Sequence, residues 1–95
     1  MRPIIISKKI EAKIQSKHEV TALEIEQCFD NKCGICLIDE REDHQTDPPT
    51  LWFIAETNTG RLLKVIFIYK DGNLIIKSAF PPDQNEIDIY ENKGK

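Results

Sequence analysis

Apolar and polar residues in the first third of the chain recur with the period of an α-helix. Within residues 8–17, Ile10 and Ile14 lie four positions apart, and Ser7 stands before them as a suitable N-cap. The apolar residues of the next segment, about 22–30, also share one side of a helix: Ala22, Ile25, Cys28 and Phe29. Each segment has one apolar face to bury, so the pattern predicts two amphipathic helices joined by a short turn.

The turn between these helices contains the first histidine of the chain. Thr21 and Glu24 have the spacing of a capping box, which marks where the second helix begins. His18 therefore lies at the corner, directly after Lys17. A histidine beside a cation can transfer protons or bind a phosphate. The alternative is a polar turn residue without chemistry.

From Lys32 onward the pattern is that of β-strands. Four segments are apolar or rich in β-forming residues: 33–39, 51–57, 61–69 and 73–79. Asn58-Thr59-Gly60 and Asp71-Gly72 are tight-turn signals between the last three segments. An acidic connection at 40–50 separates the first two. The sequence therefore predicts a four-stranded antiparallel meander.

A third helix is expected at the end of the chain. Pro81-Pro82 ends the last strand, and Asp83 with Glu86 forms a second capping box. The helix should run from about 84 to 92 and place Tyr90 on the sheet. The order of elements predicts one α+β domain that includes all 95 residues, with its helices covering one face of a small sheet.

Composition narrows the choice of function. The net charge of −3 and the pI of about 5.3 argue against an extended basic surface and against general affinity for nucleic acid. Any phosphate must bind to a local cluster of cations. The apolar run at Ile4-Ile5-Ile6 is too short for a secretory signal, and no run is long enough to span a membrane. We therefore expect a cytoplasmic protein whose three cysteines are reduced.

Two groups of residues have the composition of a metal or acid–base site. Cys33 and Cys36 have Cys-x-x-Cys spacing, but on one extended strand they would point to opposite faces, so we interpret them as small buried residues and expect no metal. The acidic run from Asp39 to His44 suits a divalent cation or proton transfer, and a solvated loop is the alternative. Within that run, Arg41 is a bidentate donor suited to a phosphate.

Two further cations lie at and within the third predicted strand. Arg61 and Lys64 have an odd spacing, so their side chains should fall on opposite faces unless a bulge intervenes. Either one is a candidate for phosphate binding, and the alternative is a solvated cation whose stem covers apolar surface. Trp52 suits base stacking or the core of the sheet. Gly-rich phosphate loops, nucleophile elbows and His-Glu-x-x-His motifs are absent from the sequence.

Four segments resemble motifs of the BrnT family, toxins of type II toxin–antitoxin systems within the RelE/ParE superfamily of ribonucleases. They are Lys17-His18-Glu19-Val20, Asp39-Glu40-Arg41-Glu42-Asp43, Gly60-Arg61-Leu62-Leu63, and Ile76-Lys77-Ser78-Ala79 with the later Glu86 and Tyr90. The resemblance implies a RelE/BrnT-like fold and a ribonuclease site without metal or other cofactor. In such a site a base takes the ribose 2′-OH proton, cations hold the phosphate and an acid protonates the 5′-oxygen.

The resemblance also implies roles for individual residues. The catalytic candidates are His18 for proton transfer, Arg41 and Arg61 for the phosphate, and Tyr90 in support. The substrate-binding candidates are Lys17, which belongs to a matching motif, and Lys64, which the strand pattern alone indicates. The partners implied are an RNA substrate and an antitoxin protein that covers the site.

Departures from the family pattern support a second hypothesis. Phe80-Pro81 stands where the family has Arg-Lys, and Glu19 replaces a glycine. The alternative is therefore a non-catalytic module that keeps the fold and binds a partner. Short bacterial chains labelled ADP-ribosyl-(dinitrogen reductase) hydrolase are similar as well. However, enzymes of that name resemble large helical domains with aspartate-bound magnesium, for which 95 residues are too few.

Overall fold

The computed structural model describes residues 3–39 and 48–94. Their elements, in chain order, are β1 (Ile4–Ile5), α1 (Lys8–His18), α2 (Ala22–Asn31), β2 (Leu37–Ile38), β3 (Thr50–Glu56), β4 (Leu62–Lys70), β5 (Asn73–Phe80) and α3 (Gln84–Lys93). The predicted helices and the last three predicted strands are confirmed, with ends that differ by at most one residue. The α+β class is also confirmed.

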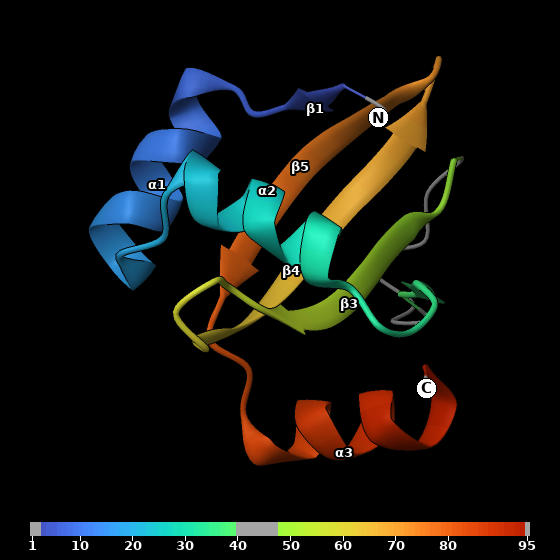
Figure 1. Cartoon of the computed structure of the whole chain (residues 1–95). Coiled ribbons are helices and arrows are strands. Elements are labelled where there is room, and N and C mark those ends of the chain that lie inside the picture. Colours follow the sequence, from blue (N-terminus) through green and yellow to red (C-terminus); the bar gives the residue numbers. More distant parts are fainter. Residues whose placement is uncertain (1–2, 40–47, 95) are drawn as a thin grey trace.

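Within residues 3–39 and 48–94 the sheet has five strands in the order β1-β5-β4-β3-β2, so the prediction of four was wrong. Figure 1 shows β1 beside β5, and β4 between β5 and β3. Strands β2 to β5 form the expected antiparallel meander, but β1 pairs with β5 in parallel, which makes the sheet mixed. In β1, Ile4 and Ile5 lie opposite Leu74 and Ile75. Two residues carry too little periodicity to be recognised as a strand from sequence.

The first predicted strand is much shorter than expected. Leu37 and Ile38 pair with β3, and the Asp39 amide donates to the Thr50 carbonyl at 2.8 Å. The backbone before Leu37 contacts the end of α3 instead. The amide of Ile35 donates to the carbonyl of Gly94 at 2.8 Å. Residues 32–36 therefore form a loop that packs against the C-terminal end of α3.

Side-chain caps fix where the helices begin. The Ser7 hydroxyl accepts from the amide of Ile10 at the start of α1. Both predicted capping boxes are present: the Glu24 amide donates to Thr21 Oγ1 at 3.2 Å, and the Glu86 amide donates to Asp83 Oδ1 at 2.8 Å. The carboxylates of Glu24 and Glu86 accept from the cap amides in return. These short-range contacts explain why the helix starts could be predicted.

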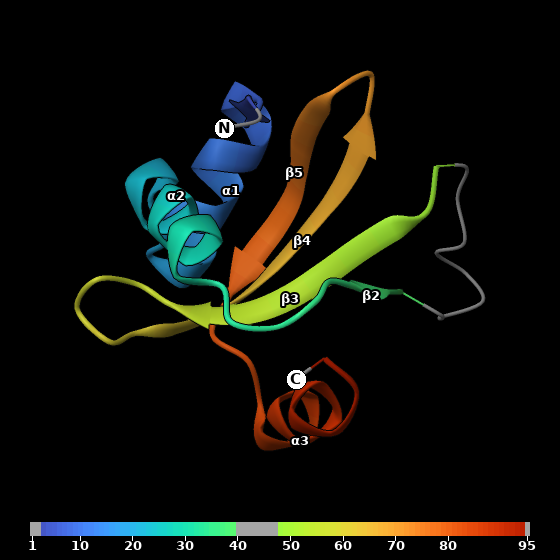
Figure 2. The same cartoon turned by 45° about the vertical axis from the view of Figure 1, so that its right-hand side comes forward.

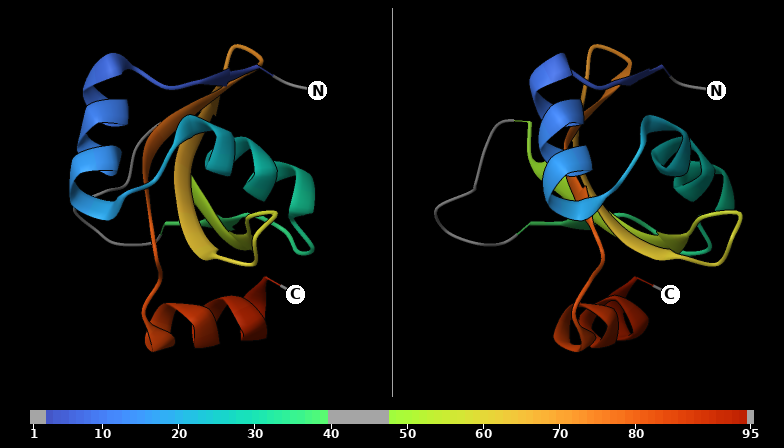
Figure 3. Two further views of the ribbon diagram at one scale, coloured as in Figure 1. Left: turned by 60° about the vertical axis from the view of Figure 1, so that its left-hand side comes forward. Right: turned by 90° about the vertical axis from the view of Figure 1, so that its left-hand side faces the viewer.

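The helices cover both faces of the sheet, which corrects the expectation that they cover one. Figure 2 shows α1 and α2 on one side of the strands and α3 on the other, and Figure 3 shows α3 beyond the sheet from two further directions. Side-chain contacts agree with this arrangement: Phe29 of α2 packs on Phe53 and Phe67, whereas Tyr90 of α3 packs on Trp52. Successive strand residues point to opposite faces, so both layers bury strand side chains.

The described residues include no helix with the length and apolar character needed to cross a bilayer.

Candidate functional site

The Arg61 guanidinium joins the turn between α1 and α2 to the start of β4. Its Nη2 donates to the carbonyl of His18 at 2.6 Å, and its Nη1 donates to the carbonyl of Glu19 at 2.7 Å. Nη1 also forms an ion pair with Glu24 Oε2 at 3.1 Å. The structure therefore brings Arg61 and His18 together, but the guanidinium contacts the backbone of His18. We call these contacts the Arg61 clamp.

The Arg61 clamp changes the acidity of Glu24. Burial alone would raise the pKa of this carboxyl, but hydrogen bonds from the Thr21 backbone and from Arg61, with the charge of Arg61, lower its pKa overall. Glu24 is thus an ionised partner for Arg61 at neutral pH, in addition to its role in the capping box.

The His18 imidazole packs against the ring of Phe80 at the end of β5. The ring centroids are 5.5 Å apart, and the planes are inclined by 46°. Lys64 Nζ lies 5.8 Å from the centroid of the same Phe80 ring. His18 and Lys64 are therefore both neighbours of Phe80, the residue that stands where the similar family has arginine. Lys17 precedes His18 in the chain and lies on the exposed surface of α1.

Lys64 is held on the α3 side of the sheet. Its Nζ lies 2.5 Å from Glu86 Oε2 and 4.5 Å from the centroid of the Trp52 ring, and only 12% of its side chain is exposed. The predicted placement of Arg61 and Lys64 on opposite faces is confirmed, because Arg61 contacts the α1–α2 turn and Lys64 contacts Glu86 of α3. Trp52 is 8% exposed and belongs to the core, as one of its two interpretations required.

Tyr90 docks α3 on the sheet, as predicted, and its hydroxyl is already hydrogen-bonded. It donates to the carbonyl of Ile35 at 2.8 Å, and the residue is 1% exposed. Burial, together with negative charge at Cys36, Cys33 and Glu91, raises the pKa of Tyr90 to about 12. The phenol is therefore protonated at neutral pH and is covered from solvent.

The five candidates that lie within the described residues do not form one constellation. His18 and Arg61 are in contact, and Lys64 approaches His18 through the Phe80 ring. Tyr90 belongs to α3, and its ring packs against Trp52 of β3. Arg41 and most of its acidic segment lie outside the described residues.

The cysteines lie in three different environments. Cys28 is fully buried, its Sγ lies 3.7 Å from the Ala55 carbonyl, and burial with the nearby Glu24 charge raises its pKa to about 11 against the effect of Arg61. Cys33 is exposed in the loop before β2, so its interpretation as a buried strand residue was wrong. Cys36 is half-buried, which raises its pKa. Within residues 3–39 and 48–94, no group of three His, Cys, Asp or Glu side chains is placed to hold a metal ion.

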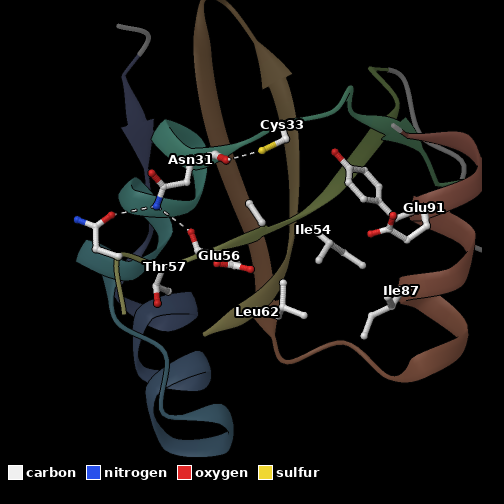
Figure 4. Close-up of a pocket in the computed structure, with 11 residues that line it drawn as sticks. Asn31, Cys33, Ile54, Glu56, Thr57, Leu62, Ile87 and Glu91 are labelled. Carbon is white, nitrogen blue, oxygen red and sulfur yellow. Dashed lines mark hydrogen bonds between the residues drawn. The ribbon is translucent and has the colours of Figure 1, made fainter. Parts of the chain in front are cut away.

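Two cavities of about 460 Å³ each lie on the two flanks of α3. We call the first the Glu91 cavity (Figure 4). Most of its lining comes from the end of α2, β3 with the turn that follows it, the start of β4, and α3. The lining residues are Asn31, Cys33, Ile54, Ala55, Glu56, Thr57, Asn58, Leu62, Ile87, Tyr90 and Glu91. We call the second the Lys93 cavity; it is lined by Leu37, Ile38, Asp39, Trp52, Lys64, Glu86, Ile89 and Lys93.

Sequence reasoning missed both cavities. Within α3, Ile87, Tyr90 and Glu91 share one side of the helix by spacing, which is the signal that was present. The residues opposite them come from β3 and β4, and no local pattern identifies them.

Neither the protein-family models nor the curated proteins compared with this sequence include a match. The relationship to the BrnT family therefore remains a hypothesis based on the four motifs.

Proposed function

We propose that this chain is a BrnT-like domain of the RelE type that binds a partner protein and does not cleave RNA. The observation that carries this proposal is that Arg61, Lys64 and Tyr90 each have partners within the fold. Arg61 and Lys64 were expected to bind the RNA phosphate, and Tyr90 was expected to support the site. Their contacts instead join α1, α2, α3 and the loop before β2 to the sheet.

Energetics support the same conclusion. To bind a phosphate, Arg61 would have to exchange contacts with two carbonyls and a carboxylate for contacts with the substrate. Each hydrogen bond of a charged group contributes about 1.5 to 3 kcal/mol, so the exchange opposes substrate binding. Phe80-Pro81 also removes two cations from the edge where His18 lies.

The second candidate is the ribonuclease toxin of the bacterial cytoplasm, neutralised by an antitoxin. The observation in its favour is that the His18 imidazole forms no hydrogen bond within the described residues and is only half-buried. Lys17 next to it is exposed. This pair is free to approach a phosphodiester. A short ribbon-helix-helix reading frame overlapping this gene would favour the toxin.

The test is induced expression of the wild-type chain and of His18→Ala in a bacterial host, with growth and RNA integrity followed in both. We expect normal growth and intact RNA in both cultures at matched levels of soluble protein. If the wild type arrests growth and degrades RNA, and His18→Ala abolishes both effects, the partner-binding proposal is wrong and the chain is a ribonuclease.

A further inference from the structure

We infer that the exposed side of α1 binds an acidic helix of a partner protein through Lys9, Lys13 and Lys17, which we call the lysine stripe. The inference rests on the proposed partner-binding function and adds the binding surface and the charge of the partner. All three side chains are exposed, while Ile14 on the core-facing side of α1 is fully buried. Figure 3 shows α1 at the outside of the molecule, with α2 beside it.

The spacing of the lysines places them in one row. Residues four apart in an α-helix are separated by about 6 Å along the axis and by about 40° around it. The lysine stripe is therefore about 12 Å long and spans about 80° of the helix surface. Carboxylates with the same spacing on a second helix, laid alongside α1, come opposite the three ammonium groups.

The lysine stripe is not neutralised by the described part of the chain. None of its lysines forms an ion pair within residues 3–39 and 48–94. The positions three and four residues before and after each lysine hold no aspartate or glutamate. Like charges at this spacing weaken a helix, so the stripe lowers the stability of α1 unless a partner supplies carboxylates.

The distribution of charge selects the class of partner. Helix α1 has four lysines and one glutamate, whereas α2 and α3 are acidic and the whole chain has a net charge of −3. A nucleic acid is charged along its whole length, so the exposed Glu26 and Asp30 of the neighbouring α2 would repel it. A protein helix can confine its carboxylates to one side. The stripe therefore fits an acidic protein helix better than RNA.

The test is an NMR titration of the ¹⁵N-labelled full chain with an alanine-rich helical peptide whose glutamates repeat every four residues. At an ionic strength of about 0.01 M, where screening is weak, we expect saturable shifts of α1 amides. A peptide of the same composition whose glutamates repeat every five residues spreads them around the helix and should bind more weakly. Raising the ionic strength to about 1 M should abolish the shifts, because the Debye length falls to about 3 Å.

Removing the lysine stripe should remove this binding without unfolding the protein. Lys9→Gln/Lys13→Gln/Lys17→Gln should bind the acidic peptide about tenfold more weakly or worse, since each exposed ion pair contributes modestly and three are lost. The variant should unfold at the same urea concentration as the wild type or at a higher one, because glutamine suits a helix and the repulsion is gone. A lower midpoint would contradict the repulsion within the stripe.

A matched control removes the same charge elsewhere. Lys70→Gln/Lys77→Gln/Lys93→Gln replaces three exposed lysines of β4, β5 and α3 and should bind the peptide like the wild type. The inference is overturned by equal weakening in both triple variants, by equal binding of the two peptides, or by an absence of saturable shifts in α1.

A single-stranded RNA of the same charge as the peptide tests the other class of partner. We expect it to bind α1 more weakly than the acidic peptide. Equal or tighter binding of the RNA overturns the inference in favour of a nucleic acid. RNA cleavage by the wild type would instead overturn the proposed function and leave the peptide titration unaffected.

Discussion

Glu19 adopts a left-handed backbone conformation at the corner between α1 and α2. Its φ is 54° and its ψ is 41°, and its amide donates to carbonyls of the last turn of α1. Glycine is the usual residue at such a helix end, because a side chain in this conformation crowds the following carbonyl. Glu19 thus holds a strained position whose carbonyl the Arg61 clamp uses.

Replacing this residue should stabilise the protein. Glu19→Gly is expected to raise the free energy of unfolding by about 0.5 to 1 kcal/mol, since the left-handed strain exceeds the added entropy of glycine in the unfolded chain. Urea denaturation measures the change. Asp71, with a φ of 55°, is the matched position. Asp71→Gly should give a smaller gain, because aspartate tolerates this conformation better than glutamate. A loss of stability in Glu19→Gly would contradict the explanation.

Glu24 should make the fold sensitive to acid. Its pKa is lowered in the folded protein from an ordinary value of 4.5, so the ionised carboxylate stabilises the fold above that value. The stabilisation is lost as the pH falls through the lowered pKa. Wild type should therefore exceed Glu24→Gln in unfolding free energy at about pH 7, and the gap should narrow at roughly pH 3. A gap that stays constant with pH would show that the charge of Glu24 is not responsible.

Contacts between residues that are close in the sequence could be predicted, whereas contacts between distant residues could not. Thr21 and Glu24 meet across three residues, so their capping box follows from spacing alone. The groups that the Arg61 guanidinium binds are 37 to 43 residues away in the chain. The cation itself was recognised as a candidate, but its partners depend on how β4 is placed beside the α1–α2 turn. No local pattern contains that information.

Among the elements, α3 is attached to the rest of the fold by a small set of polar and aromatic contacts. The hydroxyl of Tyr90 binds the Ile35 carbonyl, the Ile35 amide binds the Gly94 carbonyl, and Glu86 pairs with Lys64. Gly94 fits directly against the Tyr90 ring, where an added Cβ would come within 2.4 Å of Tyr90 Cε1. Cavities on both flanks leave α3 without further packing there.

Removing one of these contacts should loosen α3 in particular. Tyr90→Phe deletes the hydrogen bond to Ile35 and should cost about 1 kcal/mol. Amide hydrogen exchange should accelerate in α3 and in residues 32–36, while the amides of α1 and α2 serve as the internal control. Uniform acceleration across all three helices would instead show that Tyr90 contributes only to global stability.

The same elements show where pattern analysis fails. The helix boundaries followed from apolar spacing and caps, whereas β1 and the short β2 did not follow from any period. The parallel pairing of β1 with β5 joins residues about 70 positions apart, which only the folded arrangement specifies. The loop at 32–36 resembles a strand in composition, but Cys33 and Ile35 are exposed and its backbone bonds to the end of α3 instead of to a strand.

For the molecule as a whole, the two helical layers separate the candidate residues. Arg61 contacts the α1–α2 turn. Lys64 contacts α3, and Tyr90 belongs to α3, on the opposite side of the sheet. Sequence predicted the α+β class but placed all helices on one face, so it could not reveal this separation. Arg61, Lys64 and Tyr90 therefore stabilise the joints between layers. The exposed Lys17 and the half-buried His18 ring form no side-chain hydrogen bond among the described residues.

The most direct test of this account is the free energy of unfolding of Arg61→Gln. If the guanidinium holds the fold together, its loss should cost about 2 kcal/mol, the effect of removing charge-assisted hydrogen bonds that are partly screened by solvent. Lys70→Gln, which removes an exposed cation at the end of β4, should leave stability nearly unchanged. An unfolding free energy of Arg61→Gln within about 0.5 kcal/mol of wild type would contradict the account, because a guanidinium without a structural role is free for a substrate.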